Sequence, residues 1–364
     1  MSKSALPKHL LFVLVAILST ASITANAQAA TWTKVPIPTN ASLETVNMIS
    51  TVDGWAAGFD EALIHWDGKS WNNVTSPTKA TLKCLDMVNS AEGYAVAFGV
   101  GGYLNNESII QWDGTSWSNL TVRGNFESLN MVSSTDGWAV GLAGNIVRWN
   151  GTGWNHVASP TNEPLHSIDM VSSTDGWAVG QRGVIIRWDG TSWSIAKTPD
   201  SIGHRWLWSV SMVSSTNGWT VEDSGTFMRW NGTSWEYVES PTAEHLFSVD
   251  MVSSNEGWAV GATGSIIRWD GTSWNNVTSP TTAWLKSVDM VNSNEGWIAG
   301  ADGIYRWQVP GGFPGDHLVV TIAVTMVVVV AAVVVWFFTK NRIAHKSTER
   351  EVTEHQSSRV GVWL

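Results

Sequence analysis

The chain has 364 residues, among them 25 tryptophans and one cysteine, and its formal net charge at pH 7 is −10. Between residues 31 and 317, 28 Asp and Glu outnumber 14 Lys and Arg, an acidic balance that argues against nucleic acid or anionic lipid as partners. The single cysteine, Cys84, excludes an internal disulfide.

Residues 1–30 have the layout of a secretory signal peptide. Lys3 and Lys8 precede an apolar run over residues 10–18, and small residues follow at positions 25–27. The apolar run is too short to span a bilayer. We therefore expect residues 1–30 to be removed on export, which leaves residue 31 at the start of the next domain.

Residues 31–309 repeat one phrase, of which "MVSSTDGWAVGQRGVIIRWDGTSW" (170–193) is typical. Its Gly-aromatic pair recurs at spacings of 39, 44, 39, 42, 39 and 39 residues. Ser-, Asp- and Gly-rich turns divide each copy into four short stretches without helical periodicity. Four-stranded units of this period are the blades of a β-propeller. The seven copies are marked by Trp55, Tyr94, Trp138, Trp177, Trp219, Trp258 and Trp297.

The seventh copy lacks its fourth stretch after Trp307. The segment "TWTKVPIPTN" (31–40) resembles the fourth stretch of the sixth copy, "SWNNVTSPTT" (273–282). We predict that this N-terminal strand completes the last blade and so protects sheet edges that would otherwise be exposed. The expected fold is all-β, a seven-bladed β-propeller closed by the N-terminal strand, plus one C-terminal transmembrane helix.

The segment after the repeats predicts a membrane anchor. Residues 318–338 are 21 apolar or uncharged residues, long enough to cross ~30 Å of hydrocarbon as a helix. Lys340, Arg342 and Lys346 follow at once, and positive charge on that flank places the tail in the cytoplasm. We expect a linker over 310–317, a transmembrane helix over 318–338 and a short cytoplasmic tail over 339–364.

Several side chains recur at one position in most copies, and regular recurrence favours a structural role. Three tryptophans in each copy are expected to pack blade against blade. Five copies have an arginine before the tryptophan of the third stretch, expected to form ion pairs and stack on tryptophan. A polar residue precedes a recurring methionine and is expected to bond neighbouring backbone near the axis, with a cation site as the alternative. These polar residues are Asn47, Asp86, Asn130, Asp169, Ser211, Asp250 and Asp289.

The phrase over 170–193 resembles propellers of the photosystem II assembly and stability factor family, within the BNR or Asp-box group. The resemblance covers residues 31–308 and implies a ring that presents a docking surface to another protein. The Asp-box pattern is Ser-x-Asp-x-Gly-x-Thr-Trp, whereas "RWDGTSW" (187–193) is one residue tighter and lacks the double Gly. The chain would be a membrane-anchored variant, and no binding residue is carried over from the family.

Variation among the copies indicates the working face. The turns between first and second and between third and fourth stretches barely change, whereas the other connections vary and would share one rim. Aromatic and charged side chains there suit protein or carbohydrate recognition, although the tryptophans could instead cover the core. The ligand-binding candidates are His204, Arg205, Trp206, Trp208, Tyr103, Arg182, Glu222, Asp223 and Trp284.

Seven Asn-x-Ser/Thr sequons are candidate glycosylation sites in an exported domain. Turn chemistry alone also favours Asn before Gly-Thr. The sequons begin at Asn40, Asn73, Asn106, Asn119, Asn150, Asn231 and Asn276.

These patterns favour a single-pass type I protein of the cell membrane, with the propeller outside. The propeller would be a non-catalytic recognition or scaffold module for an extracellular protein or carbohydrate. The alternative is a surface glycoside hydrolase or lyase of propeller type, sialidase-like, which needs paired carboxylates about 5–9.5 Å apart or a tyrosine nucleophile. We expect no catalytic residue, no metal site and no cofactor.

Overall fold

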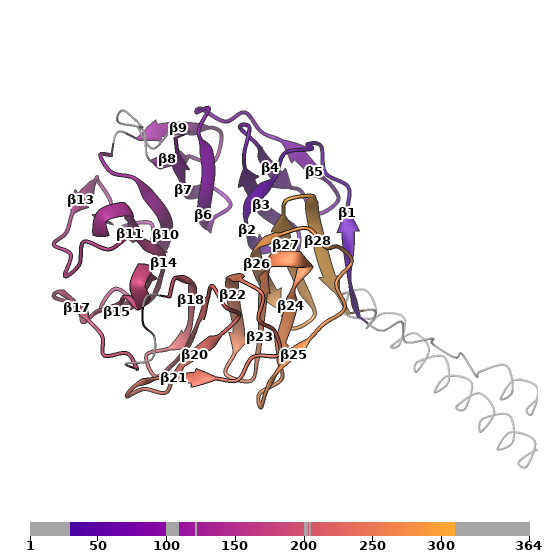
Figure 1. The fold of residues 1–364 in the computed structure, drawn as a ribbon. Coiled ribbons are helices and arrows are strands. Elements are labelled where there is room, and N and C mark those ends of the chain that lie inside the picture. The colour runs from indigo at the N-terminus through magenta and orange to yellow at the C-terminus, as the bar shows by residue number, and fades with distance from the viewer. Residues whose placement is uncertain (1–29, 100–108, 121, 200–202, 204, 310–364) are drawn as a thin grey trace, which may run out of the picture. The chain divides into compact units, whose positions relative to one another are not determined.

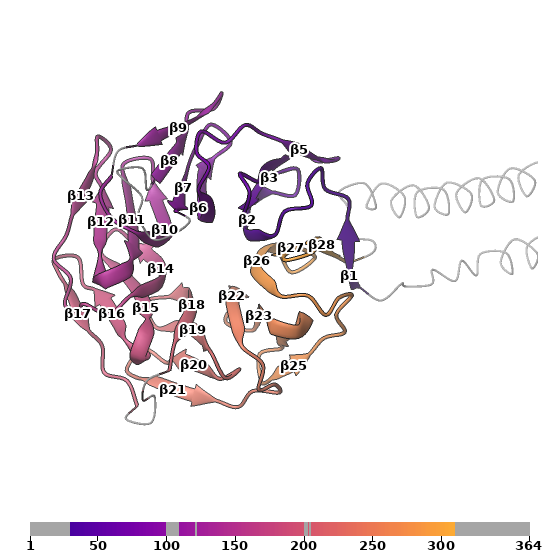
Figure 2. The same cartoon turned by 45° about the horizontal axis from the view of Figure 1, so that its top comes forward.

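The structure is a computed structural model that describes residues 30–99, 109–120, 122–199, 203 and 205–309. These residues form seven four-stranded antiparallel sheets arranged in a ring (Figure 1). The first strands of neighbouring sheets contact one another and surround the central axis (Figures 1 and 2). The predicted seven-bladed β-propeller is confirmed.

Six blades are built from four consecutive strands each. Blades 1 and 2 contain β2 (Leu43–Ser50), β3 (Asp53–Gly58), β4 (Leu63–Trp66), β5 (Trp71–Asn73), β6 (Thr81–Asn89), β7 (Glu92–Phe98), β8 (Ile109–Trp112) and β9 (Trp117–Leu120). Blades 3 and 4 contain β10 (Phe126–Ser133), β11 (Asp136–Gly141), β12 (Ile146–Trp149), β13 (Trp154–His156), β14 (Leu165–Ser172), β15 (Asp175–Gly180), β16 (Ile185–Trp188) and β17 (Trp193–Ile195). Blades 5 and 6 contain β18 (Leu207–Ser214), β19 (Asn217–Glu222), β20 (Phe227–Trp230), β21 (Trp235–Val238), β22 (Leu246–Ser253), β23 (Glu256–Gly261), β24 (Ile266–Trp269) and β25 (Trp274–Asn276).

Blade 7 joins the two ends of the described chain. Its strands are β26 (Leu285–Asn292), β27 (Glu295–Gly300), β28 (Gly303–Gln308) and, as the fourth strand, β1 (Thr31–Val35). The β1 strand pairs antiparallel with β28 from Thr31 opposite Gln308 to Val35 opposite Ile304 (Figure 2). The predicted closure by the N-terminal strand is confirmed.

The antiparallel order gives the ring two different rims. The turn rim carries the connections between first and second strands and between third and fourth strands. The loop rim carries the connections between second and third strands, including the short 3₁₀ segments η1 (Leu142–Gly144), η2 (Gln181–Gly183) and η4 (Ala262–Gly264), and the links between blades. Thr31 and Gln308 pair at the turn rim, so the described chain begins and ends there.

Tryptophans join each blade to the next, as predicted. The aromatic residue of each second strand contacts the third-strand tryptophan of the following blade, with ring centroids 4.7–5.5 Å apart. It also meets the fourth-strand tryptophan edge-on, at 5.2–5.8 Å. In the interface between blades 6 and 7 that fourth-strand residue is Trp32, which packs on Trp258. Each aromatic ring buries ~150–250 Å², so this closed set supplies much of the core.

A second closed ring, of hydrogen bonds, runs around the axis. The polar residue that precedes each methionine accepts a bond from the backbone N–H of the methionine in the next blade. Met87 N donates to Asn47 Oδ1 at 3.0 Å, and Met290 N donates to Asp250 Oδ2 at 2.7 Å. The bond from Met48 to Asp289 closes the circle. The expected bonding to neighbouring backbone is confirmed at all seven positions.

Four of the seven acceptors are half-buried carboxyl groups: Asp86, Asp169, Asp250 and Asp289. Burial raises the pKa of Asp86 to about 7 and the pKa values of Asp169 and Asp250 to about 6. Burial, with the negative charge of Asp250, raises the pKa of Asp289 well above its ordinary value. Among the described residues, no three His, Cys, Asp or Glu side chains converge closely enough to hold a metal ion.

The predicted signal peptide (1–30) lies outside the described residues except for Ala30, and the predicted linker (310–317), transmembrane helix (318–338) and tail (339–364) lie wholly outside them. Within the part of the chain that the structure describes, no helix is long and apolar enough to cross a membrane. The membrane anchor therefore stays a prediction from the sequence.

Replacing the tryptophan of the closing strand should destabilise the whole ring. We expect Trp32→Ala to lower the free energy of unfolding by about 3–5 kcal/mol, measured by urea denaturation with tryptophan fluorescence. Trp284→Ala is the control, because that indole is 53% exposed and its loss should change stability by less than about 0.5 kcal/mol. Equal effects of the two substitutions would contradict the closure.

The axial carboxyl groups predict a stability that decreases as pH rises. Because their folded pKa values lie above 3.8, the folded state holds these protons more tightly than the unfolded state. The contribution of these protonated carboxyl groups to the stability of the folded state is complete below about pH 4 and is lost as the pH rises through 6 to 7. Asp169→Asn should raise the free energy of unfolding at pH 8 by about 1–2 kcal/mol and leave it unchanged at pH 4.

Asn130 holds the equivalent position in blade 3 and accepts a hydrogen bond from the backbone N–H of Met170 at 3.0 Å. An amide group therefore fits the position of Asp169. Urea denaturation at the two pH values gives the measurement. An Asp169→Asn variant with the wild-type pH profile would show that this carboxyl group is ionised in the folded protein.

Candidate functional site

The mouth of the central channel at the loop rim is a crater of about 560 Å³. It is formed at the ends of the first strands and of the links that lead into them. The residues that line this crater are Glu44, Lys83, Glu127, His166, Trp206, Trp208, Asp223, His245, Phe247, Trp284 and Lys286.

Each blade contributes one side chain to the crater from the same place in its first strand. This residue directly follows the buried Leu or Phe that opens the strand, and a β-bulge leaves it without a partner in the second strand, as for Glu44 between Leu43 and Thr45. A bulge re-aims the side chain of its extra residue. We call these seven residues the mouth belt: Glu44, Lys83, Glu127, His166, Trp208, Phe247 and Lys286.

Two backbones approach closely beside the bulge in most blades. In blade 4 the second strand ends at Gly180, where an added Cβ would lie 1.9 Å from the carbonyl oxygen of Pro164. Five blades have glycine at this position, whereas blades 2 and 5 have Ala97 and Glu222. The bulge is present in all seven blades, so it does not depend on this glycine.

One half of the mouth belt is polar and internally paired. Lys83 Nζ lies 2.8 Å from Glu44 Oε2, and His166 Nδ1 lies 2.6 Å from Glu127 Oε2. Each pair joins neighbouring blades. Two of the three carboxylates that line the crater therefore already have a basic partner.

The other half is aromatic. The ring of Trp208 stacks on His166 at 4.6 Å and meets Phe247 edge-on at 6.1 Å. Trp206 lies 5.5 Å from Trp208, and Trp284 lies 5.6 Å from Phe247. We call Trp206, Trp208, Phe247 and Trp284 the aromatic arc.

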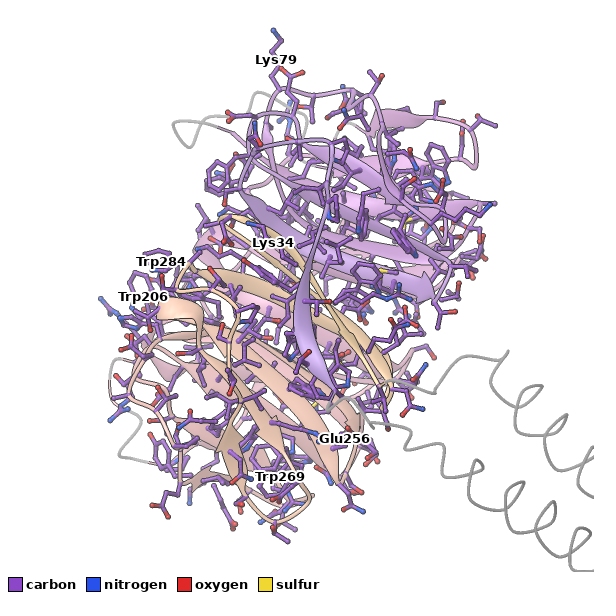
Figure 3. All side chains as sticks on the ribbon, turned by 90° about the vertical axis from the view of Figure 1, so that its right-hand side faces the viewer. Lys34, Lys79, Trp206, Glu256, Trp269 and Trp284 are labelled. Atoms are coloured by element: carbon purple, nitrogen blue, oxygen red, sulfur yellow. The ribbon has the colours of Figure 1, made fainter. Side chains whose placement is uncertain are left out.

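Two members of the aromatic arc face solvent. Trp206 is 40% exposed and Trp284 is 53% exposed, while the tryptophans of the blade interfaces are buried. Figure 3 shows Trp206 and Trp284 close together on one rim, with Glu256 at the opposite side of the ring. Both indoles therefore present part of their surface to solvent at this rim, and whether they bind a ligand or cover the core stays a prediction.

Lys286 connects the two halves of the belt. Its Nζ lies 4.5 Å from the ring centroid of Phe247 and 4.8 Å from that of Trp284, which are cation–π distances. Burial lowers the pKa of Lys286, and the nearby charge of Glu44 partly opposes this effect. The ring faces of the aromatic arc therefore already bind one ammonium group.

The structure brings four of the nine candidate residues together in the crater. These four are Trp206, Trp208, Asp223 and Trp284. Arg205 and Glu222 instead pair with each other, and Arg205 Nη1 also lies 3.3 Å from Thr226 Oγ1. Glu222 is fully buried, so this pair acts as internal support for the loop that carries Asp223.

The remaining candidates do not line the crater. Arg182 lies on η2 with its side chain 62% exposed and pairs with Glu163 at 3.3 Å. Tyr103 and His204 lie outside the described residues.

Sequence reasoning missed most of the mouth belt. These residues lie within the first strands and not in the variable connections from which the candidates came: Glu44, Lys83, Glu127, His166, Phe247 and Lys286. A signal was present in the copies themselves. The residue after the opening Leu or Phe changes from blade to blade, while its neighbours in the strand stay apolar or small.

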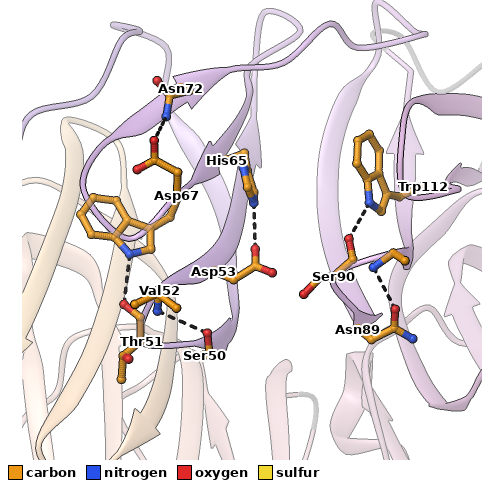
Figure 4. Close-up of polar contacts among 12 residues, drawn as sticks. Ser50, Thr51, Val52, Asp53, His65, Asp67, Asn72, Asn89, Ser90 and Trp112 are labelled. Atoms are coloured by element: carbon orange, nitrogen blue, oxygen red, sulfur yellow. Dashed lines mark hydrogen bonds and ion pairs between the residues drawn. The ribbon is translucent and has the colours of Figure 1, made fainter. Parts of the chain in front are cut away.

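The turn rim uses its polar groups internally. Third-strand indoles donate to backbone carbonyls of the adjacent turn, as from Trp66 to Thr51 at 3.1 Å and from Trp112 to Ser90 at 3.0 Å (Figure 4). Asp67 Oδ1 accepts two backbone N–H bonds within its own turn, at 2.8 Å each. The near-identity of these turns therefore has a structural cause.

The recurring arginines also have internal partners. Arg148 binds Asp136 at 2.8 Å and lies 4.9 Å from the ring centroid of Trp138. Arg187, Arg268 and Arg306 repeat this combination of ion pair and tryptophan contact in their own blades. The predicted ion pairing and stacking are confirmed for these four, which are spread around the ring.

The sequons of the described residues all begin at exposed asparagines: Asn40, Asn73, Asn119, Asn150, Asn231 and Asn276. Asn106 lies outside the described residues. Three of the side-chain amides donate hydrogen bonds: Asn119 to Pro77, Asn231 to Glu236 and Asn276 to Pro241. Glycosylation stays a prediction.

No protein-family model matches the chain, and no curated protein sequence matches it. Its fold is similar to that of YCF48 bound to D1 peptide, with a TM-score of 0.63, 18% identity, and coverage of 76% of this chain and 94% of that one. YCF48 from Cyanidioschyzon merolae gives 0.63 and 17%, covering 78% and 99%. The WD40 repeats of RRP9 give 0.62 and 11%, covering 78% and 98%. At these identities the likeness shows the fold alone, a seven-bladed propeller.

The pair of Arg205 and Glu222 predicts a stability effect. Arg205→Ala should leave the buried Glu222 carboxylate without a partner and lower the free energy of unfolding by about 2 kcal/mol. Thermal and urea unfolding measure this loss. Adding Glu222→Gln should recover part of it, whereas an unchanged stability of Arg205→Ala would show that Glu222 does not need the guanidinium.

Proposed function

We propose that this protein is a non-catalytic docking module whose crater binds a peptide segment of a protein partner. The segment lies across the channel mouth, with apolar side chains on the aromatic arc and polar groups toward the paired half of the mouth belt. The single observation that carries this proposal is the exposure of Trp206 and Trp284 at the edge of a crater lined by polar and aromatic belt residues.

A peptide suits the shape and chemistry of this site. Interface hot spots are rich in tryptophan and arginine and lie in preformed pockets with polar surroundings. The belt comes from seven rigid strands, so little ordering is needed before binding. The structural likeness to YCF48 bound to D1 peptide supports the use of such a ring for peptide docking.

A glycoside hydrolase is less well supported by the site. Two of the three crater carboxylates are in ion pairs, Glu44 with Lys83 and Glu127 with His166. A sialidase-like site would need a tyrosine nucleophile beside converging arginines. Burial raises the pKa of Tyr305 to about 12, which makes it a poor nucleophile, and none of the described tyrosines lines the crater.

The proposed location is the cell membrane, with the propeller outside and the tail in the cytoplasm. The sequence supports this with the signal peptide over 1–30 and the apolar stretch over 318–338. The described chain ends at the turn rim, where Val309 N donates to the carbonyl oxygen of Asn294 at 3.0 Å.

Peptides selected from a random library on the purified protein provide the test. Trp206→Ala combined with Trp284→Ala should weaken binding of the selected peptides at least about tenfold, measured by fluorescence anisotropy. Because both indoles are exposed, the variant should unfold at the wild-type temperature. Ile195→Ala is the matched control, since Ile195 is 61% exposed on β17 and does not line the crater.

Other outcomes would reject the proposal. Unchanged peptide binding in the double variant would move the site away from the crater. Crater-dependent binding of glycans and not peptides would assign a carbohydrate ligand. Turnover of a chromogenic glycoside that is lost in Glu127→Gln would make the protein an enzyme.

A further inference from the structure

We infer that the crater recognises a basic side chain, arginine or lysine, of the bound peptide, with Asp223 as its counter-ion and the aromatic arc as its stacking surface. This inference rests on the proposed peptide-docking function and goes further, because it assigns the charge of the ligand. Among the residues that the structure describes, none forms an ion pair with Asp223.

Asp223 is the crater carboxylate without a basic partner among the described residues. Its Oδ1 atom is buried and has no hydrogen-bond partner there, whereas Glu44 and Glu127 are paired with Lys83 and His166. A buried acceptor without a partner is destabilising, and more so when the group is charged. Because Asp223 lines the crater, a ligand cation beside it would compensate the charge of this carboxylate.

The nearest guanidinium is already occupied. Arg205 binds the buried Glu222, which directly precedes Asp223, and Arg205 also contacts Thr226. Arg205 therefore pairs with Glu222 and not with Asp223, which has no ion pair among the described residues. The backbone N–H of Asp223 donates to the carbonyl oxygen of Trp206 at 3.2 Å, which holds the carboxylate beside an exposed indole.

The aromatic arc is suited to a cation. The cationic groups of arginine and lysine are attracted to the faces of tryptophan rings, and the arginine guanidinium also stacks on them. Lys286 demonstrates this chemistry within the chain, since its ammonium lies over Phe247 and Trp284. Trp206, at the other end of the arc, has an exposed face and Asp223 next to it. A second cation therefore has both a ring and a carboxylate available there.

The charge of the whole domain favours the same ligand. The excess of acidic over basic residues between positions 31 and 317 attracts cationic segments and repels acidic ones at long range. The basic side chains that line the crater are Lys83, His166, His245 and Lys286. Lys83 and His166 are already paired with Glu44 and Glu127, and Lys286 contacts two rings. The observations favour a basic peptide over an acidic one.

The test uses the full-length protein and peptides selected from a random linear library. We expect the selected peptides to share an arginine or lysine. Replacing that residue by norleucine should weaken binding about tenfold, and Asp223→Asn should do the same. In the Asp223→Asn variant, the norleucine replacement should cause no further loss of peptide affinity, because the two changes remove the same contact. Affinity for the wild type should also fall with added salt.

Glu163→Gln is the matched control, since Glu163 is another loop-rim carboxylate, paired with Arg182 and absent from the crater lining. It should bind the peptides as the wild type does. Asp223→Lys provides a second variant and should select acidic peptides instead. Thermal unfolding shows whether each variant is folded.

The outcomes separate the two proposals. Selected peptides that depend on Trp206 and Trp284 but are acidic or uncharged, with affinity unchanged in Asp223→Asn, would overturn the cation assignment and leave peptide docking intact. A library that yields no peptide dependent on those two indoles would overturn both.

Discussion

The pairing of β1 with β28 is the constraint on which the other features depend. It places Trp32 against Trp258 and so completes the last interface between blades. Only in a closed ring do the axial hydrogen bonds meet end to end, from Asp289 back to Met48. Only then do seven first strands surround one channel and present one mouth. Circular completion of the sheet order therefore determines both stability and the position of the crater.

Within that ring, residues with a repeated structural role lie at the turn rim, and residues that vary between blades lie at the loop rim. The turn rim repeats the same side chain to backbone bonds in nearly every blade, as Trp66 and Asp67 illustrate. At the loop rim, a bulge in each first strand directs one side chain into the crater. The packing of the blade does not determine which residue type stands at that position. Seven such residues can differ without changing the blade, and here they differ in charge and aromaticity. This freedom is what allows one rim to acquire a specific ligand.

The repeat pattern was sufficient to predict the fold, because tight turns and recurring tryptophans have few structural solutions. It gave the blade number, the closing strand and the axial hydrogen bonds. The site was only partly predictable. Trp206 and Trp284 stood out as aromatic residues in variable links. No residue pattern within a single copy predicts the bulge that directs Glu44 or Lys286 into the crater, and only the variation between copies indicates their position. Arg205 looked like a ligand contact, and its role as partner of a buried Glu222 depends on tertiary packing.

The most direct test of the account is a crystal structure of the protein with a selected peptide bound. The account predicts that the peptide lies across the channel mouth at the loop rim, in contact with Trp206 and Trp284. A peptide bound at the turn rim, or along the outer strand of a blade as an added β-strand, would contradict it.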